Sequence, residues 1–324
     1  MQGFLGDTKF PITALACLVL LGGAAPGRPP YDPGRPLPEP AVFAPGSIST
    51  GEYESHPAFT PDGKTLYYLK DTPDFSHWTI VESHFEKGGW TRPEVVSFSG
   101  RYSDADPFIT PDGSRMFFIS NRPVDGKSKE DLDIWMVERK EGGGWSEPRH
   151  LGPPVSSPGN EWFPTLAADG TLYFGSNRES GKGRTDLYRA RLVDGQYAVP
   201  ENLGDAVNSP GEEFEPLISP QGDVLLFMAV RQGGQGSGDL WVSYFRDGAW
   251  TPARNLPPPI NSPAFEVSPK ISPDGRFFFF TSTRGFAAKP LEKRLTYDEL
   301  SRRLNSPGNG LGDIYQVDLS ALGL

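Results

Sequence analysis

One pattern, with a period of about fifty residues, occurs five times in this chain of 324 residues. Its copies are HPAFTPDGKTLYYL from His56, DPFITPDGSRMFFISNR from Asp106, FPTLAADGTLYFGSNR from Phe163, EPLISPQGDVLLFMAVR from Glu215 and SPKISPDGRFFFFTSTR from Ser268. A fixed period of this size is typical of stacked supersecondary units, none of which can bury its hydrophobic face alone. The pattern therefore predicts a repeat protein in which neighbouring units share a core.

Each repeat contains the elements of one four-stranded sheet. In the second repeat, residues 106–110 read as a short strand, PDG as a tight turn, and residues 116–120 as an apolar return strand. A third strand is expected at DIWMVE from Asp133, and a fourth, outer strand at WSEPRHLG from Trp145. Four antiparallel strands in about fifty residues are typical of a β-propeller blade.

The fifth repeat ends at Leu324 without a fourth strand. The N-terminal segment EPAVFAPGSISTGEYE from Glu39 parallels EPRHLGPPVSSPGNEW from Glu147 almost position for position. We therefore expect this segment to be the outer strand of the last blade, which closes the ring and removes open sheet edges. The predicted fold class is all-β, a single propeller of five four-stranded blades over residues 39–324, with six blades as the alternative.

Particular motifs carry a family resemblance. The runs TPDGSRMFFISNR and SPDGRFFFFTSTR and the strand openings DIW, DLY and DLW resemble the Pro-Asp-Gly repeats of TolB-like propellers, a WD40-like repeat family. The resemblance covers Glu39 to about Leu319, and repeat 4 departs from it with PQG at 220–222 and VR at 230–231. The resemblance implies the propeller fold. It leaves the function open, because such propellers include periplasmic scaffolds and domains attached to hydrolases.

The N-terminus predicts export. A lysine, the apolar run ITALACLVLL and the small residues GGAA are typical of a signal peptide, which we expect over residues 1–25 with cleavage after Ala24. An uncleaved anchor and a lipid on Cys17 are the alternatives. Residues 26–38 are rich in proline and are expected to form an extended linker. The mature protein is expected to be secreted or periplasmic, monomeric and without a membrane span.

Composition and motif searches exclude several classes of function. The net charge of −10 and the absence of a Lys/Arg cluster argue against nucleic-acid binding. The only cysteine, Cys17, lies in the predicted leader, so the mature chain has neither an internal disulfide nor a thiolate metal site. The chain has no Gly-x-Ser-x-Gly elbow, no His-Glu-x-x-His and no phosphate loop. We therefore assign no catalytic residue and no cofactor from sequence.

Charged residues recur at one predicted rim. Each repeat has a carboxylate three positions before the first-strand proline, and four repeats have Arg after the second strand and Asp opening the third. The first repeat lacks both, with Thr72 and Trp78 instead, which favours structural Arg–Asp pairing within a blade. The predicted structural rim residues are Arg122, Arg178, Arg231, Arg284, Asp133, Asp186, Asp239 and Asp313.

The five recurring carboxylates are expected to form a ring, in which like charges need a compensating group. Two interpretations follow: structural pairing with the arginines, or a site for a cation such as calcium or for a basic ligand. The first repeat has no Arg, so Glu54 with His56 is the strongest functional candidate, and Phe163 and Phe214 occupy adjacent positions. The candidate binding residues are Glu54, His56, Asp104, Asp106, Glu161, Trp162, Glu213, Glu215 and Glu266.

The last repeat carries the largest insertion, residues 285–312. Thr followed by two acids at 296–299 indicates a helix start, Leu300 and Leu304 share a face, and the following NSPG should end the helix. Such a helix could form a lid or a docking knob at the same rim. The alternative is simple packing over the blade.

The leading hypothesis is a binding or scaffold propeller that presents its loop-bearing rim to a protein, peptide or glycan. The alternative is a glycosidase- or peptidase-like hydrolase that uses Glu54, Asp106, Glu161 and Glu215, in which the carboxylate separation decides the chemistry. A third reading is a structural envelope protein with a central cation. The irregular first and last repeats are neighbours in a closed ring, so function is expected in that sector.

Overall fold

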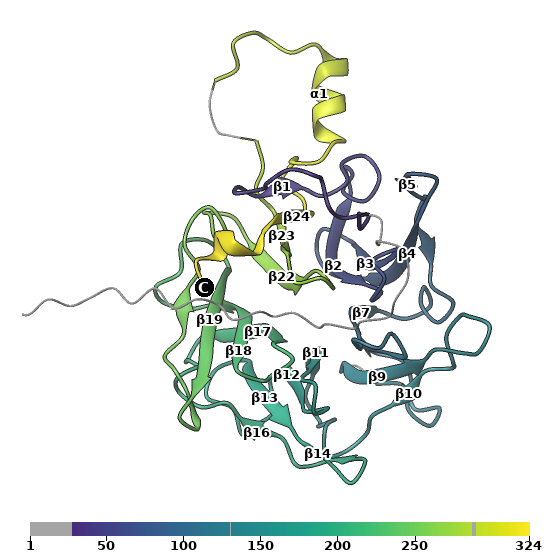
Figure 1. Ribbon diagram of the computed structural model, residues 1–324, viewed down its shortest axis with the longest axis vertical. Helices are drawn as coiled ribbons and strands as arrows, with labels where there is room; N and C mark the ends of the chain where they lie inside the picture. Colours follow the sequence, from purple (N-terminus) through teal and green to yellow (C-terminus); the bar gives the residue numbers. More distant parts are fainter. Residues whose placement is uncertain (1–27, 130, 287–289) are drawn as a thin grey trace, which may run out of the picture.

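The structure, a computed structural model, describes residues 28–129, 131–286 and 290–324. The chain forms a single β-propeller of five blades around a central axis (Figure 1). The all-β, five-bladed prediction is confirmed, and the six-bladed alternative is wrong. The predicted signal peptide over residues 1–25, with Cys17 and the cleavage position, lies outside the described residues.

Each blade is an antiparallel sheet whose strands run in sequence order from the axis outward, apart from the outer strand of the last blade. Blade 1 contains β2 (Tyr53–Phe59), β3 (Thr65–Asp71), β4 (Trp78–Glu86), β5 (Gly89–Trp90) and β6 (Glu94–Val95); blade 2 contains β7 (Asp104–Ile109), β8 (Arg115–Ser120), β9 (Asp133–Glu138) and β10 (Arg149–His150). Blade 3 contains β11 (Glu161–Leu166), β12 (Leu172–Ser176), β13 (Asp186–Ala190) and β16 (Glu201–Asn202), with a small hairpin of β14 (Leu192–Val193) and β15 (Gln196–Tyr197). Blade 4 contains β17 (Glu212–Ile218), β18 (Val224–Val230), β19 (Asp239–Arg246), β20 (Ala249–Trp250) and β21 (Arg254–Asn255); blade 5 contains β22 (Glu266–Ile271), β23 (Phe277–Ser282), β24 (Asp313–Asp318) and β1 (Ala41–Val42).

The ring closes through β1, as the parallel between the N-terminal segment and the other outer strands predicted. β1 pairs antiparallel with β24, with Ala41 opposite Gln316 and Val42 opposite Tyr315. The amide of Phe43 continues the pairing and donates to the carbonyl of Ile314 at 2.8 Å. The first strand of the propeller and its last therefore belong to the same blade.

The described part of the proline-rich segment, residues 28–38, packs against the propeller. Tyr31 is buried among aromatic rings of the first and last blades, and Leu37 is buried as well. The side-chain amide of Gln316 donates to the carbonyl of Tyr31 at 2.6 Å. The predicted separate linker over residues 26–38 is corrected accordingly, because two apolar side chains anchor the described part of this segment in the core.

The second strand of each blade supplies the core between blades. The runs LYYL in β3, MFFI in β8, LYF in β12, LLFM in β18 and FFFF in β23 are buried on both faces of the sheet. A strand covered on both faces needs continuous rather than alternating apolar residues. These strands therefore hold neighbouring blades together, and they fix the inner strands that line the axis.

The predicted insertion at 285–312 contains a helix, α1 (Tyr297–Leu304), followed later by the C-terminal 3-10 turn η1 (Leu319–Leu322). Thr296 and Glu299 form the capping box that starts α1, which confirms the predicted helix start. No residue of α1 is buried, and Figure 1 shows it standing beyond the edge of the ring near β1. The helix neither packs over a blade nor covers the axis. No helix among the described residues is long and apolar enough to cross a membrane.

Candidate active site at the propeller axis

The innermost strand of every blade is interrupted by a bulge just before its proline. The pairing register shifts there in all five blades, for example between Ser55 and Ala58 in β2. The residue before the proline has a positive φ of 53° to 59° in each case, a conformation that is strained for residues other than glycine. These five residues, which all line the axial cavities, are His56, Asp106, Phe163, Glu215 and Ser268.

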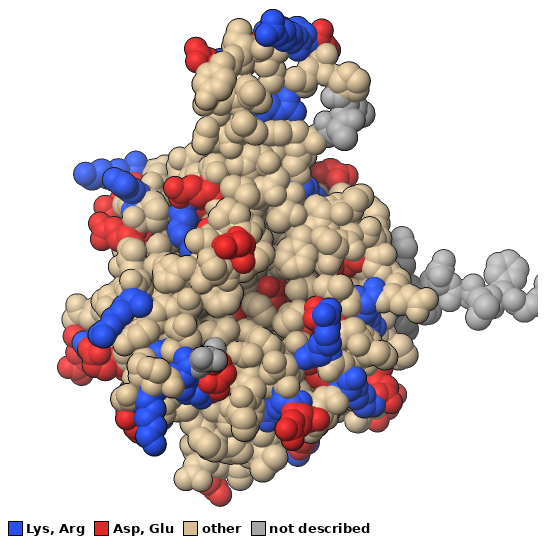
Figure 2. All heavy atoms as spheres, turned by 180° about the vertical axis from the view of Figure 1, so that it is seen from behind, with Lys and Arg blue, Asp and Glu red and all other residues tan. Residues whose placement is uncertain are grey.

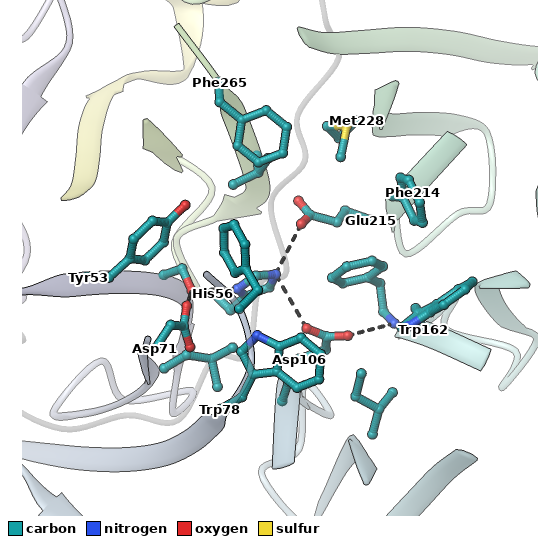
Figure 3. Close-up of a pocket in the computed structure, with 17 residues that line it drawn as sticks. Tyr53, His56, Asp71, Trp78, Asp106, Trp162, Phe214, Glu215, Met228 and Phe265 are labelled. Atoms are coloured by element: carbon teal, nitrogen blue, oxygen red, sulfur yellow. Dashed lines mark hydrogen bonds and ion pairs between the residues drawn. The ribbon is translucent and has the colours of Figure 1, made fainter. Parts of the chain in front are cut away.

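Three of the five bulge residues form one polar cluster. Nε2 of His56 lies 3.3 Å from Oδ1 of Asp106 and 3.1 Å from Oε1 of Glu215 (Figure 3). The other oxygen of each carboxylate accepts a backbone N–H from the next blade in sequence. Asp106 accepts from Phe163 at 3.1 Å, and Glu215 accepts from Ser268. Two carboxylates from blades 2 and 4 are thus held on one imidazole from blade 1.

A chain of hydrogen bonds that ends on a third carboxylate, that of Asp71, orients His56 through its Nδ1 atom. The hydroxyl of Ser55 donates to Oδ2 of Asp71 at 2.6 Å. Since a serine has only one hydroxyl hydrogen, Ser55 accepts from Nδ1 of His56 at 2.8 Å. Nδ1 therefore carries a proton, and Nε2 faces the two carboxylates. A further proton is shared among Nε2, Asp106 and Glu215 whenever the cluster is protonated.

Burial and mutual charge shift the pKa values of these groups. Burial raises the pKa of Asp106 to about 7, even though the charge of His56 acts in the opposite direction. Burial also raises the pKa of Asp71 to about 6. Burial alone would lower the pKa of His56, but the neighbouring Glu215 and Asp106 carboxylates outweigh it, so that the pKa is raised. The cluster thus retains protons at a pH where exposed carboxylates have lost them.

An apolar cavity of about 250 Å³ opens above the cluster. Its walls are aromatic side chains from four blades, and Figure 3 shows the rings around His56, Asp106 and Glu215. The ring of Phe163 stacks on His56 with 5.4 Å between centroids. Figure 2 shows that one face of the molecule is hollowed at the centre of the ring, with acidic side chains at the bottom. The aromatic residues of the cavity are Tyr53, Phe75, Trp78, Trp162, Phe163, Phe214 and Phe265.

A smaller cavity of about 10 Å³ lies on the other side of the cluster. Lys270 lines it, and burial lowers the pKa of its ammonium group despite the opposing charges of Glu215 and Asp106. His56, Asp106 and Glu215 line both cavities, so the cluster separates them along the axis. The amino group of Lys270 therefore lies in the cavity behind the two carboxylates.

The predicted ring of five carboxylates does not converge on the axis. Each member is fully buried inside its own blade, and serine, threonine, lysine or arginine side chains hold it. Arg178, for example, donates to Glu161 at 3.1 Å and to the carbonyl of Val155 at 2.7 Å. This supports the structural interpretation of the ring and corrects the expectation of a ligand mouth there. The residues concerned are Glu54, Asp104, Glu161, Glu213 and Glu266.

The predicted pairing of the arginines with the third-strand aspartates is wrong, whereas the alternative pairing with the ring carboxylates is found. Arg122, Arg178, Arg231 and Arg284 pair with the first-strand carboxylates Asp104, Glu161, Glu213 and Glu266 rather than with the aspartates that open the third strands. Those aspartates accept other hydrogen bonds. Asp186, Asp239 and Asp313 accept backbone N–H groups of the preceding loops, and Asp133 accepts from Lys129 and lies 3.1 Å from His150. The third-strand aspartates hold the preceding loops in place, because backbone N–H groups lie close to them and the guanidinium groups already pair with the first-strand carboxylates.

In blade 1, a lysine takes the place of the arginine as the partner of the first-strand carboxylate. Lys70 lies opposite Glu54 in the β2–β3 ladder, where the other blades have Ser or Ala, and its ammonium group pairs with that carboxylate. Glu54 is therefore a structural residue, and its expected role beside His56 in a binding site is corrected. Of the sequence candidates, His56, Asp106, Trp162 and Glu215 do line the cavity, together with Phe163 and Phe214.

Several cavity residues were missed at the sequence level, among them Tyr53, Asp71 and Phe265. A usable signal was present for the two aromatic residues. The position before the third-strand aspartate is Gly238 in blade 4 and Gly312 in blade 5, and a Cβ at either would overlap the ring of Phe265 or Tyr53 in the following blade. The other blades have His, Leu or Thr at this position. Glycine there marks an aromatic residue at the mouth of the cavity.

The axial cluster predicts how stability depends on pH. The pKa values of Asp106 and His56 are raised by folding, so the folded chain holds more protons than the unfolded chain from about pH 4 to 7 through Asp106, and His56 extends this range to higher pH. The free energy of unfolding should therefore fall as the pH rises through this range. Thermal melts at about pH 6 and 8 measure the effect. Asp106→Asn should show a clearly smaller fall than the wild type, and equal falls would contradict the assignment.

Within residues 28–129, 131–286 and 290–324, no group of three His, Cys, Asp or Glu side chains is arranged to hold a metal ion. The cluster at the axis contains one imidazole wedged between two carboxylates, with the nitrogen occupying the point on which the oxygens converge. Its geometry suits proton transfer between His56, Asp106 and Glu215 and a molecule in the cavity.

Comparisons with known proteins show which solved structures the fold resembles. No family model matches the chain, and no curated protein matches its sequence. Solved structures match its fold. The α-L-arabinofuranosidase PaAbf62A from Podospora anserina, in complex with cellotriose, aligns over 87% of this chain and 98% of its own, with 12% identity and a TM-score of 0.50.

Two further structures show weaker likeness. The α-L-arabinofuranosidase of Lactobacillus brevis aligns over 84% of this chain and 92% of its own, with 10% identity and a TM-score of 0.48. The periplasmic gluconolactonase PpgL of Pseudomonas aeruginosa aligns over 71% and 66%, with 14% identity and a TM-score of 0.40. At such identities the likeness concerns the fold alone. The protein is a five-bladed β-propeller with an apolar cavity on its axis, at the floor of which lie the carboxylates of Asp106 and Glu215.

Proposed function

We propose that the protein is a propeller hydrolase that cleaves a glycosidic bond in its axial cavity. The observation that carries the proposal is a pair of buried carboxylates, Asp106 and Glu215, on one imidazole at the floor of an aromatic cavity. Glycoside hydrolysis commonly uses two such carboxylates. The arabinofuranosidases with a similar fold fit this proposal. The cavity volume of about 250 Å³ is smaller than the roughly 300–1,000 Å³ of pockets for drug-sized ligands, so the cavity suits a single sugar unit.

Asp106 and Glu215 have different roles in the proposed reaction. Asp106, with a raised pKa, is the general acid that donates its proton to the glycosidic oxygen as the bond to the leaving group breaks. Glu215, which lies 3.1 Å from Nε2 of His56 and accepts from the Ser268 amide, is the carboxylate that attacks the anomeric carbon. Water then cleaves the glycosyl ester, and Asp106 takes its proton. His56 is a positioning residue that holds both acids.

The separation of the two acids predicts the stereochemistry. Their oxygens lie 3.3 Å and 3.1 Å from the same nitrogen, which favours the roughly 5–5.5 Å separation of a retaining pair over the roughly 6.5–9.5 Å of an inverting pair. The product should therefore keep the anomeric configuration of the substrate.

A panel of aryl glycosides of pentoses and hexoses, α-L-arabinofuranoside included, tests the proposal through release of the phenol. Proton NMR of the first sugar product reports its configuration. Release of sugar with retention is the expected result. The proposal fails if no glycoside of the panel is cleaved above the rate of an Asp106→Asn variant.

A binding propeller is the second candidate function. It is favoured by one observation: both carboxylates already accept a hydrogen bond from a backbone amide and lie within 3.3 Å of Nε2 of His56, as in a fixed receptor. This candidate predicts that sugars or peptides bind in the cavity without turnover. Isothermal titration with the same panel separates the two functions.

Two finer proposals concern family and location. The Pro-Asp-Gly turns and strand openings support membership of the TolB-like propellers, and the apolar run at the N-terminus supports export. Mass spectrometry of the protein recovered from its native host checks the second proposal. A mature chain that begins at Ala25 is expected, and an intact leader would contradict it.

A further inference from the structure

The wall of the axial cavity that blade 1 forms contains two buried polar atoms without a partner. Oδ1 of Asp71 and the hydroxyl oxygen of Tyr53 have no hydrogen bond to any described residue. Both residues line the cavity, and Figure 3 shows them side by side to the left of His56, with the Tyr53 hydroxyl directed inward. Buried polar groups are normally satisfied, and an unsatisfied one has an energetic penalty that a ligand can remove.

The two atoms are fixed rather than free to turn toward other partners. Oδ2 of Asp71 already accepts from Ser55 at 2.6 Å, which leaves Oδ1 toward the cavity. The ring of Tyr53, only 4% exposed, lies against Gly312 of blade 5 and makes an edge contact with Phe75 at 5.1 Å between centroids. The wall is thus a preformed pair of an acceptor and a hydroxyl.

The charge of the cavity lining is unbalanced. Its charged residues are Asp71, Asp106, Glu215 and His56, and its lining contains neither lysine nor arginine. Even with His56 protonated, three carboxylates face one positive charge when all are ionised. Lys270 lies behind the cluster, in the smaller cavity, and does not reach the blade 1 wall. A ligand with a positive charge would compensate the excess.

Aromatic rings surround the same wall. Phe75 and Trp78 come from blade 1, and Phe265 from blade 5 neighbours Tyr53 in the lining. The negative face of an aromatic ring attracts a cation, and more strongly where water is excluded. Carboxylate and rings together form an environment that favours an ammonium group over a neutral one.

We propose that the blade 1 wall binds a protonated amino group of the substrate, so that the substrate of the axial site is an amino-bearing sugar. One N–H of the ammonium group donates to Oδ1 of Asp71 and a second to the oxygen of Tyr53, while the rings of Phe75 and Trp78 cover its apolar side. The proposal rests on the proposed glycoside hydrolysis only where it calls the ligand a substrate. The binding itself does not depend on turnover.

A neutral hydroxyl group is the competing occupant of the wall. It can donate only one hydrogen, whereas an ammonium group donates three and carries the charge that the lining lacks. Burial raises the pKa of Asp71 to about 6, which still leaves its carboxylate mostly ionised at neutral pH. An ionised carboxylate with a hydrogen-bond donor on only one of its oxygens favours an ammonium group over a neutral hydroxyl.

Titration of the purified protein with glucosamine and with glucose at about pH 7 tests the proposal, because the two sugars differ only in the amino group. The fluorescence of Trp78 and Trp162 reports occupancy of the cavity, and calorimetry confirms it. We expect glucosamine to bind at least about tenfold more tightly than glucose. Equal affinities would overturn the proposal and identify a hydroxyl as the occupant.

Matched variants locate the effect. Asp71→Asn should weaken glucosamine binding about tenfold or more and leave glucose binding nearly unchanged. Asp74→Asn makes the same change of charge on an exposed residue of blade 1 and should have less than about a twofold effect. The proposal is overturned if both variants weaken binding equally, or if neither does. Tyr53→Phe, which removes only the hydroxyl, provides a second test should Asp71→Asn fail to fold.

The outcomes separate this proposal from the proposed function. Hydrolysis of neutral aryl glycosides with no preference for glucosamine would retain the hydrolase and refute the amine site. Tight, Asp71-dependent binding of glucosamine with no hydrolysis of any glycoside would retain the amine site and refute the hydrolase. If both hold, an aryl glucosaminide should be a better substrate than the matching aryl glucoside, and Asp71→Asn should reverse the preference through KM.

Discussion

Replacement of Asp106 by asparagine should lower the rate of glycoside hydrolysis by about 10²–10⁴-fold, the usual contribution of a general acid. Asparagine has nearly the same shape, and its side-chain oxygen can still accept from the Phe163 amide, which Asp106 does at 3.1 Å. It cannot donate a carboxyl proton to the leaving group. The substitution therefore removes the chemistry with little change in the cavity, and sugar binding should persist.

The pH profile provides the sharper evidence for this role. In the wild type, kcat should fall as the pH rises through about 7, since Asp106 then loses the proton that it donates. That limb should disappear in Asp106→Asn. Asp112→Asn in the same repeat, on the turn at the opposite rim, is the matched control and should keep the wild-type profile. Retention of full activity by Asp106→Asn would exclude Asp106 as the acid.

Replacement of Arg122 by methionine should reduce the free energy of unfolding by about 3–5 kcal/mol, the usual result of breaking a buried ion pair. The guanidinium group donates to Asp104 at 2.5 Å, to the carbonyl of Phe98 at 3.0 Å and to Ser120 at 2.8 Å. It also packs over the ring of Trp135 at 5.3 Å. Without it, the fully buried carboxylate of Asp104 loses its counterion and the hydrogen bond from the guanidinium group.

Urea denaturation of the wild type and of Arg122→Met measures this loss. Arg101→Met, an exposed position in the loop before β7, is the matched control and should change the unfolding free energy by no more than about 0.5 kcal/mol. The double variant Asp104→Asn/Arg122→Met should recover part of the stability, because the uncompensated charge is gone. If Arg122→Met did not change the free energy of unfolding, the ion pair between Arg122 and Asp104 would fix the geometry of the blade without adding to its stability.

The fold could be predicted because its signals are local and repeated. Pro-Asp-Gly turns place the hairpins of repeats 1, 2 and 5, the related ADG and PQG turns place those of repeats 3 and 4, and the doubly buried second strands appear as continuous apolar runs. The closing strand β1 was also predictable, since its sequence parallels that of the other outer strands. The proline-rich segment was not, because Tyr31 and Leu37 contribute to a core whose other half comes from the two ends of the ring.

The site could be predicted only in part. Periodicity showed that each repeat has a carboxylate and an X-Pro residue near the rim, but it did not show which of them faces the axis. The bulge decides this: it turns His56, Asp106 and Glu215 inward and leaves the recurring carboxylates inside the blades. Asp71 was invisible to the repeat pattern, since its equivalents in the other blades are Asn, Val or Thr.

The sector in which function was expected contributes part of the candidate site. Blade 1 contributes His56, Asp71 and the aromatic wall, and the foot of the insertion in blade 5 contacts blade 1 where Asn309 donates to the carbonyl of Gly51 at 3.1 Å. Blades 2 and 4 contribute the two acids, so the site is not confined to one sector. Helix α1 lies outside it.

The pairing of β1 with β24 also sets an order of events during synthesis. Within the propeller, the strand that is made first waits for the one that is made last, so the ring stays open until nearly all of the propeller has left the ribosome. A chain that stops before β24 leaves β1 unpaired and β23 as an open sheet edge. Such unfinished chains therefore expose a free strand and an open edge that can pair with other chains.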